Sequence, residues 1–238
     1  MNNFGFDYEK QIPAGFYDEI YRRKAGIRYC WHDLKFRSVA ANLTQAKKLL
    51  DVGCGPGTFI GNYLSDIAAL GIDLSASQVD YANRHYSTNA HRFSIQSIEG
   101  LVSSGESFDA VTMIELVEHL APDYVARLFT QARRLLSPDG ILVVTTPNYR
   151  SLWPILEWGI NFLSPVSYEQ QHTNKYHRDR LVGELAAAGY RSVTIETAVG
   201  LAPFTAVLGL KSAQWLHALE TKMGHLNCGN LLLAVAKP

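Results

Sequence analysis

Short apolar segments alternate with longer segments of helical pattern along most of this chain of 238 residues. The helical patterns lie at residues 57–66, 75–86, 122–140 and 178–190. The strand-like segments are rich in aliphatic and β-branched residues, and they lie at residues 47–53, 68–74, 91–96, 107–115, 141–148, 191–199 and 229–238. Strands that alternate with helices form a largely parallel sheet covered on both faces, so the pattern predicts an α/β fold.

Three segments depart from this alternation. The first, residues 1–45, is rich in aromatic residues and arginine, and Gly26 is expected to divide its helical pattern into two helices. The other two are largely apolar and lie at residues 149–176 and 199–224. We expect a helical lid and two cap insertions, all attached to a ligand-binding core at residues 46–148 within one domain of residues 1–238.

The composition narrows the class of protein. Apolar residues make up 47% and charged residues 18%, as in globular proteins, and the net charge of zero without a basic stripe disfavours nucleic acid as a partner. Cys30, Cys54 and Cys228 are widely spaced, which argues against disulfides or a zinc site and fits a reducing cytosol. The N-terminal residues are unlike a signal peptide, and no apolar run reaches the ~18 residues of a spanning helix. A cytoplasmic protein is therefore expected.

The segment LLDVGCGPG, residues 49–57, forms an expected turn between a strand and a helix. Gly53, Gly55 and Gly57 would allow a tight turn and the close approach of a ligand to the backbone. A P-loop needs a lysine after the last glycine, and the dinucleotide fingerprint needs glycine at position 58, where Thr58 stands. On this motif alone, an ordinary turn that binds no ligand remains an alternative interpretation.

Asp73 indicates an adenosine ligand. It ends the segment 68–74, twenty residues after Gly53. A carboxylate at this strand end can accept hydrogen bonds from both ribose hydroxyls, and its charge disfavours the 2′-phosphate of NADP. Ser97 and Ile98 follow the next strand, where they are placed to contact the adenine.

Five segments resemble, in order, the motifs of class I S-adenosylmethionine-dependent methyltransferases: LLDVGCGPG, GIDLS, SFDAVTMIELVEHL, ARRLLSPDGILVVTTPN and LVGELAAAGY. The resemblance covers about residues 46–198. It implies a Rossmann-like sheet of seven strands in the order 3-2-1-4-5-7-6, with the seventh strand antiparallel and helices on both faces. It also implies S-adenosylmethionine as cofactor, bound by Asp51, Gly53, Gly55, Gly57, Asp73, Leu74, Ser97, Ile98 and Glu115. For the methionine carboxylate, Arg28 and Arg37 are candidate partners, although both also fit a solvated helix face.

The spacing ExxEH places Glu115, Glu118 and His119 after the fourth expected strand. Within the family it looks like the ubiquinone-biosynthesis O-methyltransferases, where these residue types are associated with a divalent metal. Two carboxylates and an imidazole suit Mg²⁺, which would lower the pKa of an acceptor hydroxyl. Relatives with a similar histidine lack a metal, so His119 as a general base and as a structural residue stay open.

His172 is the second catalytic candidate. It lies in YEQQHTNKYH, after the first apolar insertion, and the ubiquinone enzymes have a histidine in roughly this place. An imidazole with an ordinary pKa accepts protons near neutral pH. A loop histidine that only makes surface hydrogen bonds is the alternative.

The two apolar insertions contain three of the four tryptophans, Trp153, Trp158 and Trp215. Tryptophan favours membrane interfaces, so peripheral membrane contact is one interpretation. A cap over the active site or a homodimer face is the other. We expect residues 150–170 and 203–220 to be largely helical and to lie together beside the acceptor site. Both interpretations favour a small apolar or amphipathic acceptor.

Three functions stay open at this point. O-methylation of a small hydroxylated acceptor leads, and N- or C-methylation in a natural-product or sugar pathway is the second. A non-catalytic cofactor-binding scaffold is the third, although the intact glycine turn and Asp73 argue against a degenerate site.

Overall fold

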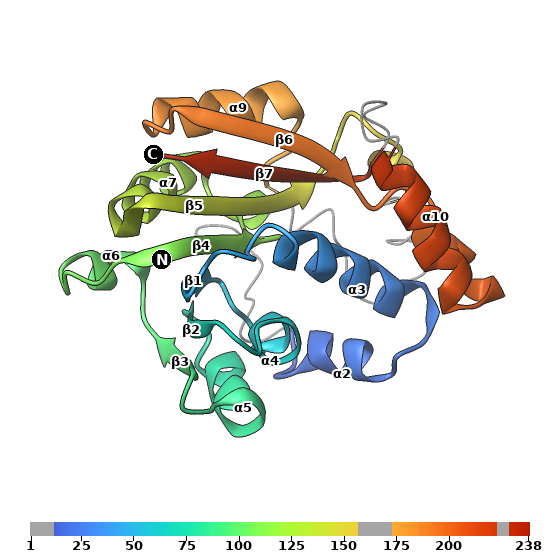
Figure 1. Ribbon diagram of the computed structural model, residues 1–238, viewed down its shortest axis with the longest axis horizontal. Helices are drawn as coiled ribbons and strands as arrows, with labels where there is room; N and C mark the ends of the chain where they lie inside the picture. The colour runs from blue at the N-terminus through green and yellow to red at the C-terminus, as the bar shows by residue number, and fades with distance from the viewer. Residues whose placement is uncertain (1–11, 157–172, 223–228) are drawn as a thin grey trace.

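The computed structural model describes residues 12–156, 173–222 and 229–238. In this part of the chain, seven strands form one sheet in the order β3-β2-β1-β4-β5-β7-β6 (Figure 1). They are β1 Lys48–Val52, β2 Ala68–Asp73, β3 His91–Ile95, β4 Phe108–Ile114, β5 Leu136–Pro147, β6 Ser192–Ala198 and β7 Leu231–Lys237. Strand β7 pairs antiparallel with β5 and β6, whereas β1 to β5 pair in parallel. The predicted strand order and the antiparallel seventh strand are confirmed.

Helices surround the sheet. They are α2 Phe16–Arg22, α3 Gly26–Ala40, α4 Thr58–Tyr63, α5 Ala76–Tyr86, α6 Ile98–Val102, α7 Pro122–Leu135, α9 Arg178–Ala187 and α10 Leu210–Lys222, with the 3-10 helices η1 Val117–His119 and η2 Ala202–Leu208. Gly26 begins α3 with a φ of 84°, so it divides the first helical segment as predicted. The described residues contain no helix that is both long and apolar enough to cross a membrane.

The end of α7 corrects the sequence prediction. The sequence predicts that Pro138 and Gly140 stop this helix and that the next strand starts at residue 141. Instead α7 ends at Leu135, and β5 begins at Leu136, which pairs with Phe108 of β4. Pro138 has no N–H to continue the helical hydrogen bonds. The chain therefore leaves the helix before Pro138 and pairs with β4.

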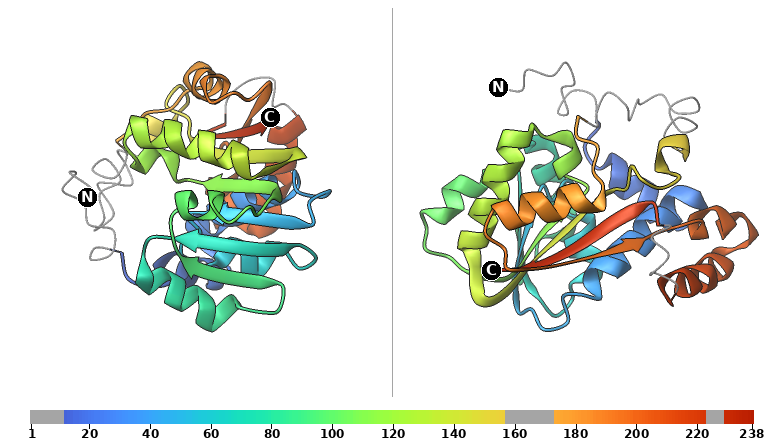
Figure 2. Two further views of the ribbon diagram at one scale, coloured as in Figure 1. Left: turned by 90° about the vertical axis from the view of Figure 1, so that its left-hand side faces the viewer. Right: turned by 90° about the horizontal axis from the view of Figure 1, so that it is seen from above.

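Two layers of apolar side chains hold the helices against the sheet. Because successive strand residues point to opposite faces, Leu49 packs with Phe59 of α4 and Leu50 packs with Phe129 of α7. Helices α6, α7 and α9 cover one face, and α3, α4 and α5 cover the other (Figure 2). Strand β5 lies between these two layers with residues 142–147 buried, as a segment of continuous apolar and β-branched residues favours.

The helical lid is attached to the core by a buried carboxylate. Asp18 of α2 accepts hydrogen bonds from the hydroxyls of Thr58 (2.8 Å), Tyr81 (2.9 Å) and Tyr86 (2.5 Å). Figure 1 shows α2, α3 and α10 beside the edge of the sheet at which the parallel strands end. Ligands bind at this edge in open α/β sheets, so the lid lies where a cofactor is expected.

The two cap predictions have different outcomes. Residues 203–220 are helical as predicted, in η2 and α10. Of residues 150–170, only 150–156 belong to the described part of the chain, and residues 153–156 are helical.

Candidate cofactor and acceptor site

The glycine turn between β1 and α4 has the backbone that its sequence predicts. Gly53, Gly55 and Gly57 have φ values of 73°, 51° and 78°, which side chains with a Cβ rarely adopt. A Cβ on Gly53 would lie 2.8 Å from the end of the Leu116 side chain, so a larger residue there would also displace that side chain. Gly55 is buried, but a Cβ on it would meet nothing within 4 Å, so there is open space beside the backbone at this point of the turn.

Asp73 joins the glycine turn to the end of β2. One carboxylate oxygen accepts from the backbone N–H of Gly55 and the other from that of Ser75, both at 2.9 Å. A carboxylate oxygen has two lone pairs, so an oxygen that accepts one backbone N–H can also accept a hydrogen bond from a ribose hydroxyl. The position of Asp73 therefore suits the role that the sequence predicts for it.

Asp51 is a second carboxylate at this edge, buried on β1. Its carboxylate accepts a hydrogen bond of 2.7 Å from the hydroxyl of Thr112. Burial raises the pKa of Asp51 to about 7, and the charge of Asp73 adds to the increase while the bond from Thr112 opposes it. A cationic group of a ligand would relieve the repulsion between the two carboxylates. The pair therefore fits a ligand that carries an ammonium or sulfonium group.

The residues predicted for the adenine differ in exposure. Leu74, which follows Asp73, is 67% exposed, whereas Ile98 is buried in the core. Ser97 is the residue before α6 and is partly exposed. Leu74 and Ser97 thus present surface to an adenine, and Ile98 offers the backbone at the start of α6. These assignments stay predictions.

A buried lysine, missed in the sequence, lies at the same edge. Lys35 of α3 forms an ion pair with Glu115, which follows β4. Of the arginines considered for the methionine carboxylate, Arg37 binds Asp33 at 2.8 Å on the solvent side of α3, and Arg28 is exposed. Lys35 is therefore the better candidate. Its spacing of four residues from Trp31 was the available signal, because it puts both side chains on one face of α3.

His32 lies beside this ion pair and was also missed. Burial and the charge of Lys35 together lower the pKa of His32 to about 3, against the opposing charge of Glu115. The imidazole is therefore neutral at physiological pH. It can form hydrogen bonds in the site, but it is a weak proton acceptor.

The predicted Mg²⁺ set of Glu115, Glu118 and His119 is not supported. Within residues 12–156, 173–222 and 229–238, no three carboxylate, imidazole or thiol side chains are grouped closely enough to hold a metal ion. Glu115 is bound to Lys35, and Glu118 is buried in η1. The spacing ExxEH reveals neither the ion pair of Glu115 nor the burial of Glu118. The ion pair depends on the distant helix α3, and the burial depends on the path of the 3-10 helix η1.

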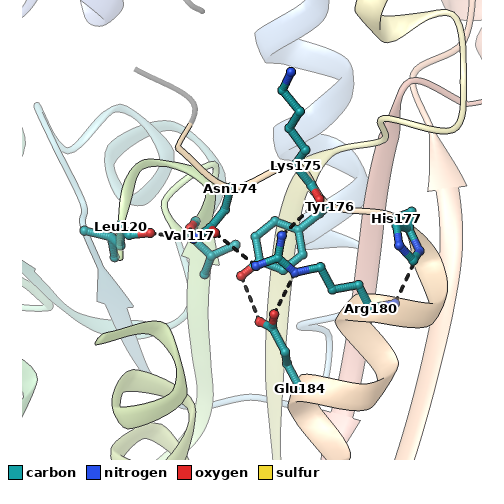
Figure 3. Close-up of polar contacts among 8 residues, drawn as sticks. All are labelled: Val117, Leu120, Asn174, Lys175, Tyr176, His177, Arg180 and Glu184. Atoms are coloured by element: carbon teal, nitrogen blue, oxygen red, sulfur yellow. Dashed lines mark hydrogen bonds and ion pairs between the residues drawn. The ribbon is translucent and has the colours of Figure 1, made fainter. Parts of the chain in front are cut away.

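The chain that follows His172 is fixed against η1. His172 itself lies outside the described residues, but the hydroxyl of Thr173 and the backbone N–H of Asn174 both donate to the carbonyl of Glu118, at 3.2 and 3.0 Å. The side-chain amide of Asn174 also donates to the carbonyl of Leu120 (Figure 3). The end of the first insertion is therefore anchored to the turn that carries His119.

Helix α9 holds Asn174 in this position. Arg180 donates to the amide oxygen of Asn174 at 3.0 Å and to Glu184 at 2.8 Å, and Tyr176 donates to the other oxygen of Glu184 at 2.9 Å (Figure 3). Burial and the charge of Glu184 raise the pKa of Tyr176, so its hydroxyl remains a donor. Through Asn174, this network connects η1 to helix α9 and thereby fixes the orientation of η1. The catalytic roles of His119 and His172 stay predictions.

The lid and the first insertion meet through two tryptophans. The rings of Trp31 and Trp153 lie 5.2 Å apart, and Trp153 is only 5% exposed. Trp153 therefore fits a cap, whereas Trp215 of α10 is 67% exposed. Trp158 lies outside the described residues. The two insertions thus differ, because one packs on the lid and the other also presents an aromatic ring to solvent.

A family model described as a methyltransferase domain matches residues 21–195. The chain belongs to this methyltransferase family. The match begins within α2 and reaches β6, so it contains the glycine turn, Asp73, the Lys35–Glu115 pair and η1. The resemblance to class I S-adenosylmethionine-dependent methyltransferases is confirmed for the family, and the strand order agrees with it.

Individual relatives match the chain to different extents. A ubiquinone biosynthesis O-methyltransferase of Haemophilus ducreyi is 33% identical over 117 residues, which cover 45% of this chain and 48% of that protein. The chain thus matches about half of that relative's length. An uncharacterized transposon protein of Streptomyces fradiae is 28% identical over 265 residues, which cover 96% of this chain and 71% of that protein.

Solved structures confirm the fold. A SAM-dependent methyltransferase from Archaeoglobus fulgidus superposes with a TM-score of 0.60 at 20% identity, covering 88% of this chain and 99% of that one. Magnesium protoporphyrin IX methyltransferase from Synechocystis PCC 6803, solved with bound SAH, superposes with a TM-score of 0.64 at 15% identity. The superposition covers 98% of this chain and 97% of that one. At these identities the likeness concerns the fold alone.

Proposed function

We propose that this chain transfers a methyl group from S-adenosylmethionine to a hydroxyl of a small, largely apolar or amphipathic acceptor. Membership of the methyltransferase family supports the donor. The similarity to the ubiquinone biosynthesis O-methyltransferase supports oxygen as the acceptor atom. The observation that carries the proposal is the arrangement of Asp73, Asp51 and Lys35 around one edge of the sheet.

The charged side chains at this edge suit the separate polar groups of S-adenosylmethionine. Asp73 would accept the ribose hydroxyls, and the open space beside Gly55 would allow the ligand to approach the turn closely. Lys35 would bind the methionine carboxylate, while Asp51 and Glu115 would face the methionine ammonium group. When bound, this cofactor supplies an electrophilic methyl group on a sulfonium.

The chain must also place the acceptor and remove its proton. Methyl transfer needs the acceptor oxygen in line with the methyl–sulfur bond, and alignment of the reactants supplies much of the rate. The Trp31–Trp153 pair would form an apolar wall that excludes water from this position. His119 and His172 are our candidates for the general base, because η1 and the end of the first insertion are joined through Asn174.

A methyl-transfer assay with labelled S-adenosylmethionine tests the proposal. The purified chain would be incubated with panels of phenols, catechols, amines and carbon nucleophiles of matched size and hydrophobicity. We expect label on phenolic oxygen. Label on nitrogen or carbon would contradict O-methylation while leaving the family unchanged. Binding of the demethylated cofactor without turnover on any panel would favour a non-catalytic scaffold.

A further inference from the structure

Apolar side chains extend into solvent at the turn between η2 and α10. Val207 is 74% exposed, Leu208 is 81% exposed, and Trp215 on the following helix is 67% exposed. Gly209 between the helices is also exposed, so three consecutive residues of this turn are open to solvent. Large apolar side chains that are exposed together commonly mark a surface that binds a partner. We call Val207, Leu208, Lys211, Trp215 and Lys222 the hairpin surface.

The charges of the hairpin surface are all positive. Lys211 and Lys222 are exposed and lie four residues before and seven residues after Trp215, so the three side chains share one face of α10. Glu220 is the acidic residue of α10, but its carboxylate binds the backbone before η2 and does not belong to this face. It accepts the backbone N–H groups of Gly200 at 3.1 Å and Leu201 at 2.6 Å. The outer face of α10 therefore combines an aromatic ring with two cations.

The neighbouring connection between α2 and α3 continues this pattern. Residues 22–28 contain Ile27 and no acid, and every one of them is exposed. Of their four cations, Arg23, Lys24 and Arg28 carry the positive charge of this surface, whereas Arg22 donates to the hydroxyl of Tyr81 beside the buried Asp18. Cys30 and Leu34, on the same face of α3 as Ile27, pack with Ala202 of η2. Figure 1 shows this connection and α10 at the same side of the molecule.

We propose that the hairpin surface and residues 22–28 dock this chain on an anionic lipid bilayer. Val207, Leu208 and Trp215 enter the interfacial layer, where tryptophan is favoured. Lys211 and Lys222 extend their ammonium groups to the headgroups while their stems remain apolar. An acidic protein is a less suitable occupant, because protein interfaces are depleted in lysine and this surface combines lysine with a turn of protruding aliphatic side chains. The proposal is independent of which acceptor the enzyme methylates.

Vesicle flotation with the full chain tests the docking. The probes are vesicles of phosphatidylcholine alone and vesicles in which about a third of the lipid is phosphatidylglycerol. We expect binding to the anionic vesicles only, and a decrease as added salt screens the charges. The double variant Lys211→Gln/Lys222→Gln should bind roughly 30-fold more weakly, since each cation near an anionic surface contributes about 1 kcal/mol. The double variant Val207→Ser/Leu208→Ser should lose binding at all salt concentrations.

Two matched variants serve as controls. Ile155→Ser removes an aliphatic side chain that is 67% exposed outside the hairpin surface, and Arg134→Gln removes an exposed cation of α7. Both should bind anionic vesicles like the unchanged chain, and thermal unfolding should confirm that all variants are folded. Absence of binding to anionic vesicles would overturn the proposal. So would a loss of binding with Ile155→Ser that equals the loss with Val207→Ser/Leu208→Ser.

Discussion

The ammonium group of Lys35 binds the carboxylate of Glu115, although 80 positions separate the two residues. Lys35 is buried, and Glu115 has a φ of 49°, which residues other than glycine rarely adopt. The helical lid is thereby joined to the end of β4, at the edge that also holds Asp51 and Asp73. Since a buried cation needs a partner, the ion pair stabilises Lys35 at this edge, where its ammonium group would be placed to bind a carboxylate ligand.

Replacement of Lys35 should weaken cofactor binding through the methionine carboxylate. We expect Lys35→Met to bind S-adenosylhomocysteine about 10- to 100-fold more weakly, the range for losing a hydrogen bond between charged groups. Methylthioadenosine lacks the carboxylate, so its affinity should not change. Calorimetry with both ligands measures the difference. Lys35→Met/Glu115→Gln, which leaves no unpaired carboxylate, should give the same result, and an equal loss for both ligands would disprove the assignment.

Asp73 should determine the affinity for the ribose. Asp73→Ala is expected to weaken binding of S-adenosylhomocysteine by about 1–3 kcal/mol, because two hydroxyls lose a charged acceptor. Asp80→Ala removes an exposed carboxylate of α5 and should leave the affinity unchanged. Titration calorimetry of the two variants provides the comparison, with NAD as a second ligand. NAD binding as tight as that of S-adenosylhomocysteine would contradict the adenosyl assignment.

Asp51 should make the stability of the ligand-free protein depend on pH. Its pKa of about 7 in the folded protein exceeds the ordinary value of 3.8, so the folded state binds the proton more tightly. The stabilisation is complete below about pH 4 and is lost as the pH rises to about 7. The unfolding free energy of the unchanged chain relative to Asp51→Asn should therefore fall across this window. Urea denaturation at several pH values measures it, and parallel pH profiles would show that Asp51 titrates normally.

The sequence predicted the strand order through the family motifs, and the strands themselves through segments rich in aliphatic and β-branched residues. It placed the end of α7 wrongly, because the pairing of Leu136 with Phe108 is a contact between strands that a helical pattern does not encode. Lys35 was missed for a similar reason. Its spacing from Trp31 places it on the same face of α3, but that spacing does not reveal a partner that is 80 positions away in the chain.

The helical lid should depend on Asp18 for its attachment. Asp18→Ala leaves the hydroxyls of Thr58, Tyr81 and Tyr86 without their acceptor, so we expect a loss of about 3 kcal/mol in the free energy of unfolding. Glu19→Ala changes the adjacent, exposed acid and should cost less than about 0.5 kcal/mol. Chemical denaturation gives both values. Equal effects of the two substitutions would mean that the buried cluster contributes nothing specific.

His119 should act as the proton acceptor if catalysis needs one. The transferred methyl group fixes the position of the acceptor oxygen, so a base must reach that oxygen directly or through one water. His119 lies on η1, whose carbonyls hold Thr173 and Asn174, and His172 immediately precedes them in the chain. We therefore expect His119→Ala or His172→Ala to lower the rate about 10²- to 10⁴-fold at neutral pH with saturating cofactor.

The pH profile separates a base from a structural histidine. Loss of a general base should remove the rise in rate near the pKa of the imidazole, and raising the pH should partly restore the rate. A structural substitution would lower the rate equally at every pH and would also lower the unfolding temperature. His177→Ala, at the start of α9, is the matched control and should retain the rate. If His119→Ala and His172→Ala both retain near-normal rates, the acceptor needs no histidine base, and alignment of the reactants alone would account for the catalysis.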